Sequence, residues 1–532
     1  MHLPQEILTR IAFHCTTSTR ANLLTASHAT QAAVEEVAWD STFQLKSSTI
    51  PKFLSLYQGH RIRLLRKIVF TFDFPELRPP GYVEYMVYPD TDDEDEGPYE
   101  PIPCRETASE LKAKDEIFTD QISQLFNALK ILKERELDAG NQSVERTLSI
   151  ITPAQNIHGH ICEHRRFSSW NLHLLTPDSL PQLSSIRTLI IGEDASFWTY
   201  MFESQSACER PIDPCVVFQL VGKMPCLETL DVRYLYEGLQ YPYEAEVNRH
   251  HSRVWEGPRR DGRVDAAEVM GRLGGGARGA LKNMVVRFGS VDAWLSLDQG
   301  IAMPDLCSPF TYDPLSAALR IYSQNLVTLE IQGVVDQTLF WPVQEDGGSI
   351  PFWPRLKSLK VTFHSGTPSG RWYFQGLQGQ GMNSRGFKIE EKHYPPMEPH
   401  DGDEEWDDES GRYENSSPNM FRTKPIDEEV ERLLGAFAKA LDVMPVLESA
   451  ELFTFLHFES GDEDNVKLLG QEGGRVPKME ISPWDIVCRW GVRYVAGGSN
   501  ARLEWQVGRW RPSRDLEKLF CRVVPEKQWV YL

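Results

Sequence analysis

A short leucine pattern recurs six times and constrains the fold more than any other feature of the chain. Its template is L-x-x-L-x-L, and the copies begin at Ile186, Leu227, Leu281, Leu326, Leu356 and Leu447. In most copies the last four residues alternate between polar and apolar, which is the period of a β-strand with one buried face. Each copy therefore predicts one short strand of a sheet.

Most of these strands follow a stretch with the character of a helix. Helices are predicted over residues 215–224, 264–273, 314–324 and 428–444, and a further helix over 115–136 leads into a strand at 146–152. A helix followed by a strand, repeated along a chain, predicts parallel strands joined by crossover connections.

Two α/β architectures fit this alternation. Stacked in one direction, the units make a curved solenoid. Successive copies are 30 to 91 residues apart, whereas a regular leucine-rich repeat has a period of about 20–29 residues. The strand template favours an irregular leucine-rich-repeat-like solenoid with insertions, and the irregular spacing leaves an ordinary α/β sheet as the alternative.

Acidic stretches interrupt the pattern. Residues 90–96, 403–409 and 462–464 are rich in Asp and Glu, and such segments bury too little apolar surface to offset the entropy of ordering. We expect mobile insertions over about 76–110 and 365–425.

The domain prediction is a three-helix unit at 1–45, the α/β region at 46–455 and a C-terminal α+β cap at 456–532. Within the cap, strands at 487–495 and 503–507 form a hairpin, and a helix follows at 513–523.

The net charge of −20 argues against nucleic-acid and membrane partners, because a field of that sign repels phosphate backbones and anionic lipids. The densest basic cluster, residues 259–263, is short and is interpreted as a surface loop. No apolar run is long enough to span a bilayer, and no secretory signal is visible. The nine scattered cysteines suggest no disulfide framework. These features predict a cytoplasmic or nuclear protein.

The first forty residues predict three short helices, at about 4–11, 18–27 and 30–39. A bundle of this size cannot bury all of its apolar groups. The remainder must face either the rest of the chain or a partner, and docking of helices on an apolar surface is a recurrent recognition mode.

The opening LPQEIL, residues 3–8, together with Ile11, resembles the start of an F-box. Leu23-Leu24 and Trp39 stand near the positions where that family places a leucine-containing segment and a tryptophan. Residues 26–30 depart from the family pattern. The passage from residue 53 to residue 70 also resembles fungal F-box proteins with a degenerate leucine-rich C-terminal region.

This resemblance implies a non-catalytic substrate-recognition adaptor of a cullin–RING (SCF-type) ubiquitin ligase. The F-box would bind the adaptor subunit of the ligase, and the α/β region would hold a target protein that the sequence does not identify. By family position, the contact with the adaptor subunit is assigned to Leu3, Pro4, Ile7, Leu8 and Ile11. If this apolar face instead packs on the downstream domain, the protein is a leucine-rich scaffold with no ubiquitin-ligase link.

One cluster has the residue types of a metal site. His158, His160, Cys162 and His164 alternate, so an extended segment would place them on one face, and zinc accepts imidazole and thiolate ligands. No second ligand pair with ordinary spacing is evident, so we interpret the cluster as a polar loop and predict no cofactor. Residues 271–279 are glycine-rich but lack the Lys-Ser/Thr of a phosphate-binding loop and are interpreted as a flexible connector. The sequence also lacks hydrolase, metalloprotease and kinase signatures, so no enzyme activity is predicted.

Overall fold

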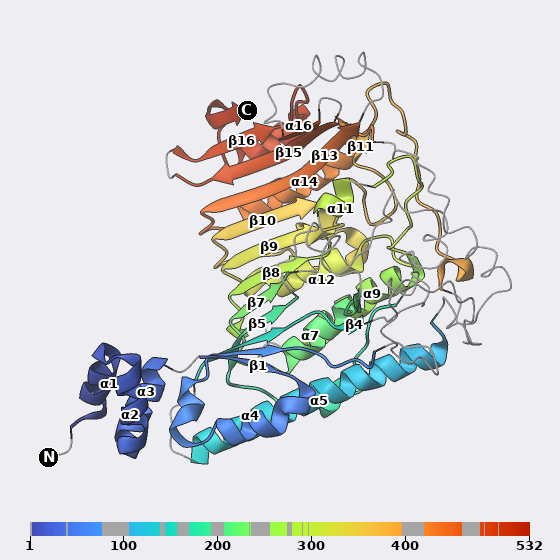
Figure 1. The fold of residues 1–532 in the computed structure, drawn as a ribbon. Coiled ribbons are helices and arrows are strands. Elements are labelled where there is room, and N and C mark those ends of the chain that lie inside the picture. The colour runs from blue at the N-terminus through green and yellow to red at the C-terminus, as the bar shows by residue number, and fades with distance from the viewer. Residues whose placement is uncertain are drawn as a thin grey trace.

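A single mixed sheet of 13 strands runs through the protein (Figure 1). The structure is a computed structural model that describes residues 3–38, 41–76, 106–138, 144–156, 170–192, 207–233, 235, 256–273, 279–289, 291–295, 297–395, 420–459, 479–482, 485–497 and 500–532. A separate unit of three helices precedes the sheet and projects beside its first strands (Figure 1).

Nine strands of the sheet are parallel to one another and lie side by side in the order of the sequence. They are β1 (Thr42–Leu45), β2 (Lys67–Phe70), β3 (Arg146–Ile150), β5 (Ile186–Ile191), β7 (Thr229–Val232), β8 (Asn283–Arg287), β9 (Thr328–Gly333), β10 (Ser358–Phe363) and β13 (Ser449–Glu459). Because each strand pairs with its neighbours in the chain, the described strands stack in one direction, as a solenoid requires. The predicted α/β class with a large parallel sheet is confirmed.

The six leucine patterns form the adjacent strands β5, β7, β8, β9, β10 and β13. Their second apolar positions stand in one register row across the sheet: Leu189, Leu230, Met284, Leu329, Leu359 and Ala450. All six side chains are buried. The pattern therefore marks the inward-facing residues of neighbouring strands, as the alternation predicted.

Helices cover one face of the sheet and form the core with it (Figure 1). They are α4 (Ile50–Leu56), α5 (Ala108–Asp138), α7 (Pro214–Gly222), α9 (Glu256–Arg272), α12 (Pro314–Tyr322) and α14 (Asp427–Asp442). Helices α7 and α12 begin where expected, because the side chains of Asp213 and Asp313 cap their first turns. Among the described residues, no helix has both the length and the apolar character needed to cross a membrane.

The prediction of a surface loop at residues 259–263 is wrong. Helix α9 begins at Glu256, eight residues earlier than its apolar pattern suggested, and takes in this basic cluster. Arg263 is buried and its guanidinium lies 2.6 Å from the carboxylate of Asp313. Gly262 lets α9 approach α7 closely, since a Cβ there would lie 2.7 Å from the Asp213 carboxylate. A buried arginine with an acidic partner replaces the expected solvated charge.

Much of the expected insertion at 365–425 is instead packed. Residues 365–395 and 420–425 are described, and β11 (Phe374–Gln375) pairs with β12 (Lys424–Pro425). Trp372, Tyr373 and Phe374 are buried, so these aromatic side chains supply the apolar surface that the acidic stretch lacks. The acidic residues 403–409 lie outside the described residues, as do residues 77–105 of the other expected insertion.

The C-terminal region continues the same sheet. Strand β13 pairs antiparallel with β15 (Asp485–Val495), which pairs with β16 (Arg502–Gln506), and β17 (Trp529–Tyr531) lies beyond β16. The short β14 (Met479–Ser482) pairs with β15. The predicted hairpin is confirmed, as is the helix, α16 (Arg514–Cys521), capped by Ser513. The expected boundary at 455/456 falls inside β13, so the cap is not separated from the sheet there.

Candidate partner-binding site

The N-terminal unit consists of α1 (Gln5–His14), α2 (Thr17–Ala26) and α3 (His28–Ala38). Its core is small: Ala12, Ala33 and Val34 are buried, and Leu8, Leu23 and Val37 pack against them while partly exposed. The three helices therefore match the sequence prediction, although the unit ends before residue 45. Residues 42–45 form β1 of the main sheet, where Leu45 is buried.

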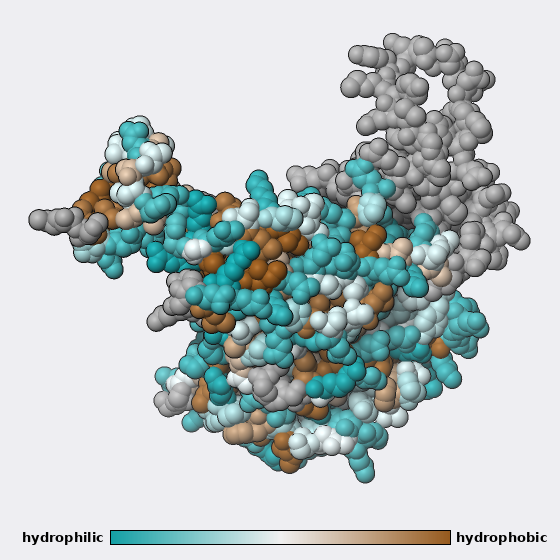
Figure 2. All heavy atoms as spheres, turned by 90° about the horizontal axis from the view of Figure 1, so that it is seen from below, coloured by the Kyte–Doolittle hydropathy of each residue, from teal (hydrophilic) through white to brown (hydrophobic). Residues whose placement is uncertain are grey.

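Apolar side chains of α1 and its approach remain exposed. Leu3, Ile7 and Ile11 are 50%, 41% and 43% exposed. The spacing of four residues places Ile7 and Ile11 along one side of α1, and Leu3 lies just before the helix. Figure 2 shows hydrophobic side chains gathered on this projecting unit. Since neither the small core nor the sheet covers these residues, they form a surface available to a partner.

The structure separates the five predicted contact residues into two groups. Leu3, Pro4, Ile7 and Ile11 are exposed, whereas Leu8 is half-buried and packs into the core of the unit. Leu8 and Ala12 are four residues apart and face α3, because each follows Ile7 or Ile11 by one residue and is rotated from it by about 100°. Leu8 therefore has a structural role within the unit, and its contact with a partner stays a prediction.

Two further exposed apolar residues were not anticipated from the sequence. Phe13 at the end of α1 is 65% exposed, and Leu24 on α2 is 40% exposed. The guanidinium of Arg20 donates to the backbone carbonyls of Ala12 and Phe13, at 2.9 and 2.8 Å, and fixes α2 against the end of α1. An apolar residue in a short bundle can face either the core or solvent. The sequence pattern alone therefore did not predict that Phe13 and Leu24 are exposed.

An ion pair joins the unit to the main body. Glu35 on α3 accepts hydrogen bonds from Arg61 and His60 in η2 (Gly59–Leu64) and from Gln31 on its own helix. The hydrogen bond from Arg61 is the main reason that the pKa of Glu35 falls to about 2, against the opposing effect of burial. The carboxylate is therefore ionised at neutral pH and holds α3 on the sheet-bearing part of the chain.

The candidate metal ligands His158, His160, Cys162 and His164 lie outside the described residues. Within the described ranges, no group of three or more His, Cys, Asp or Glu side chains is arranged to hold a metal ion. The glycine-rich residues 274–278 also lie outside the described part.

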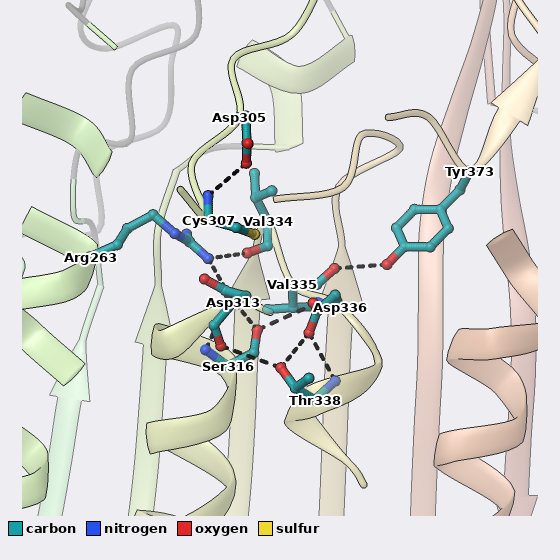
Figure 3. Close-up of polar contacts among 10 residues, drawn as sticks. All are labelled: Arg263, Asp305, Cys307, Asp313, Ser316, Val334, Val335, Asp336, Thr338 and Tyr373. Carbon is teal, nitrogen blue, oxygen red and sulfur yellow. Dashed lines mark hydrogen bonds and ion pairs between the residues drawn. The ribbon is translucent and has the colours of Figure 1, made fainter. Parts of the chain in front are cut away.

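A buried polar cluster occupies the carboxyl end of strand β9 (Figure 3). Open α/β sheets bind ligands at this edge, which makes the cluster a candidate active site. The Asp313 carboxylate accepts from Arg263 at 2.6 Å and from the backbone N–H and hydroxyl of Ser316, at 3.0 and 2.5 Å. The same guanidinium donates to the carbonyl of Val334 at 2.9 Å. These contacts cap α12 and tie α9 to the end of β9.

The second carboxylate of the cluster, that of Asp336, also accepts hydrogen bonds from nearby residues of the chain. Asp336 accepts from the backbone N–H and hydroxyl of Thr338, at 2.8 and 2.5 Å. Burial, with the nearby charge of Asp313, raises the pKa of Asp336 to about 7. Burial also raises the pKa of the Cys307 thiol, which keeps it neutral and unlike a catalytic nucleophile. The arrangement fits a structural role better than acid–base or nucleophilic catalysis.

The face of the sheet opposite the helices carries rows of polar side chains. One register row reads Thr147, Thr188, Thr229, Asn283, Thr328, Ser358 and Ser449. Beyond this row, charged side chains pair across the sheet: Glu330 on β9 lies 3.2 Å from Arg287 on β8 and 3.3 Å from Lys360 on β10. We call this surface the open face. Its half-buried polar residues are positioned by the alternation of the strands.

A scan of known protein families found no match to this chain, and a search of curated proteins found none either.

Proposed function

We propose that this chain is a non-catalytic substrate-recognition adaptor of a cullin–RING (SCF-type) ubiquitin ligase, acting in the cytoplasm or nucleus. The observation that carries the proposal is the joint exposure of Leu3, Ile7 and Ile11 on the three-helix unit. It is supported by the resemblance of residues 3–11 to an F-box, whose adaptor subunit covers this kind of surface. The α/β region then presents a target protein.

The energetics favour a partner that covers more than three side chains. Burying an aliphatic side chain completely stabilises a complex by about 1.5–3 kcal/mol. Three residues that are already about half-buried contribute roughly half of that each, while association costs at least about 4 kcal/mol. The partner must therefore also cover further apolar side chains, and Phe13 and Leu24 are the other large ones exposed among the described residues of this unit.

In this proposal the ion pair of Glu35 and Arg61 presents the apolar surface in a fixed direction relative to the sheet. An adaptor works by holding its target at a set position relative to the ligase, so a rigid joint serves this function better than a free linker. The open face provides half-buried polar side chains on rigid strands, which suits recognition of a target protein.

Capture by the purified adaptor subunit tests the proposal. The wild-type chain is expected to be retained on immobilised adaptor subunit, and the triple variant Leu3→Ala, Ile7→Ala, Ile11→Ala is expected to lose retention. The control variant Ile321→Ala, Ile350→Ala, Phe352→Ala removes exposed apolar side chains from the α/β region instead (44%, 71% and 53% exposed). It should be captured like the wild type.

Failure of the wild-type chain to be captured would overturn the adaptor function and leave a leucine-rich scaffold. Equal loss in both triple variants would show that capture depends on general hydrophobicity and not on the three-helix unit.

A further inference from the structure

The last strand of the sheet has an unoccupied outer edge among the described residues. Strand β17 pairs with β16 only. The N–H of Leu532 donates to the carbonyl of Trp505 in β16, at 2.8 Å. Because successive residues of a strand direct their backbone groups to opposite sides, the N–H and C=O of Tyr531 point to the outer edge. An exposed edge of this kind is a template for pairing with another strand.

The C-terminal part of the sheet has an excess of basic residues, although the whole chain has a net charge of −20. At Tyr531 itself, the charge of Arg511 is opposed by those of Glu517 and Glu526. Residues 485–532 contain nine Lys and Arg against five Asp and Glu. Arg509 and Arg511 lie in the connection between β16 and α16, and Arg514 is the first residue of α16. All three are exposed, and no ion pair joins them to a carboxylate of the described residues. The guanidinium of Arg511 lies 4.1 Å from the ring centroid of Tyr531, which places this connection beside β17.

We propose that an extended acidic segment of a partner protein adds to the outer edge of β17 as a further strand. In an added strand, alternate side chains fall on opposite faces of the sheet. Those on the face of Tyr531 lie beside Arg511, and those on the other face lie beside Val530, which is 41% exposed. The edge therefore fits a segment in which acidic and apolar residues alternate. This inference does not rest on the proposed function.

Charge selects this occupant over two others. A second copy of the chain, paired edge to edge, would bring its own arginines against Arg509, Arg511 and Arg514, and like charges at short range are unfavourable. A nucleic acid would meet the local arginines but also the net charge of −20 of the whole chain. An acidic peptide strand gains electrostatic attraction from the arginines, and because it is short it brings few negative charges near the rest of the acidic surface.

The experiment measures fluorescence anisotropy of a labelled peptide with the full chain. The probe is a short peptide of alternating Glu and Val, and its matched control has the same composition with all Glu in one block. The wild-type chain should bind the alternating peptide at least about tenfold more tightly than the block peptide. The variant Arg509→Gln, Arg511→Gln, Arg514→Gln should bind it about tenfold more weakly, as three exposed ion pairs suggest.

Two controls separate the edge from general charge. The variant Lys52→Gln, Arg63→Gln, Arg66→Gln removes the same charge from exposed residues near the first strands and should bind like the wild type. Tyr531→Pro removes the outward N–H without removing a bond to β16, and Tyr531→Thr removes the same ring but keeps the N–H. Only Tyr531→Pro should abolish the preference for the alternating peptide.

Equal binding of the alternating and block peptides would overturn strand addition and leave a basic patch. The proposal also fails if Tyr531→Pro and Tyr531→Thr bind alike, or if a single-stranded oligonucleotide competes for the same arginines more tightly than the peptide does.

Discussion

The guanidinium of Arg61 binds both carboxylate oxygens of Glu35, with N···O distances of 2.6 and 3.0 Å. His60 approaches the same carboxylate at 2.6 Å. Bidentate contacts of this kind are stronger and more directional than a single ion pair. This joint sets how the exposed apolar side chains of α1 are presented relative to the sheet.

The joint should weaken in acid. The pKa of Glu35 is about 2 in the folded protein, chiefly because of Arg61, against an ordinary value of 4.5. With a lowered folded pKa, the stabilisation is complete above pH 4.5 and is lost as the pH falls toward 2. We expect Glu35→Gln to destabilise the attachment of α3 by about 1–3 kcal/mol at pH 7, seen as faster hydrogen exchange in α3.

Glu36→Gln is the control, because the neighbouring Glu36 accepts a hydrogen bond from Thr9 within the three-helix unit. It should exchange like the wild type in α3. The wild type should approach Glu35→Gln as the pH is lowered from 4.5 to 2, and a constant difference across that interval would contradict the assignment.

Replacement of Leu8 should lower the free energy of unfolding of the three-helix unit more than replacement of Ile7. Leu8 packs against the core of the three-helix unit, whereas Ile7 is exposed. Leu8→Ala is expected to destabilise the unit by about 1–3 kcal/mol, and Ile7→Ala by less than about 0.5 kcal/mol. The rate at which a protease cleaves within residues 3–38 of the full chain measures the difference. Equal protection of the two variants would show that Leu8 does not hold the unit together.

Asp313 should be sensitive to loss of its charge and of its cap. Asp313→Ala leaves the buried Arg263 without this carboxylate and uncaps α12, so a loss of about 3–5 kcal/mol in the free energy of unfolding is expected. Asp313→Asn keeps an oxygen for the cap and should cost less. Urea denaturation compares the two, and a loss below about 1 kcal/mol for Asp313→Ala would contradict this role.

Gly491 should not tolerate a side chain. Its φ of +154° and its place in β15 put an added Cβ 2.1 Å from the carbonyl oxygen of Leu452 in β13. Gly491→Ala should destabilise the protein by about 2–4 kcal/mol. Gly435→Ala in α14 is the control, because the nearest atom to its Cβ is 3.6 Å away, and it should stabilise by up to about 1 kcal/mol. Thermal unfolding measures both, and a neutral Gly491→Ala would contradict the contact.

The parallel strands could be predicted because each repeats the same short pattern of alternating polar and apolar residues. Leu230, Leu329 and Leu359 occupy equivalent positions, and burial of one predicts burial of the others. The start of α9 could not be predicted in the same way. Arg263 is buried because Asp313, 50 positions away in the chain, supplies its partner, and such a pairing leaves no signature in a local window.

The candidate site could be predicted only in part. The sequence placed Ile7 and Ile11 on one apolar face of α1, but it left open whether that face is exposed, as the structure shows. The inward position of Leu8 depends on where α3 crosses α1, which the spacing does not specify. The joint at Glu35 was equally hidden, because a single glutamate in a helix gives no indication that Arg61 will meet it.

The sequential pairing of the strands has a mechanical consequence. Tension applied between β1 and β15 would meet, among the described strands, none that returns across the stack to bind a distant one. Rupture would then proceed one strand at a time, at a nearly constant and modest force. At β13 the resistance would change, because its eleven-residue pairing with β15 must shear as a whole.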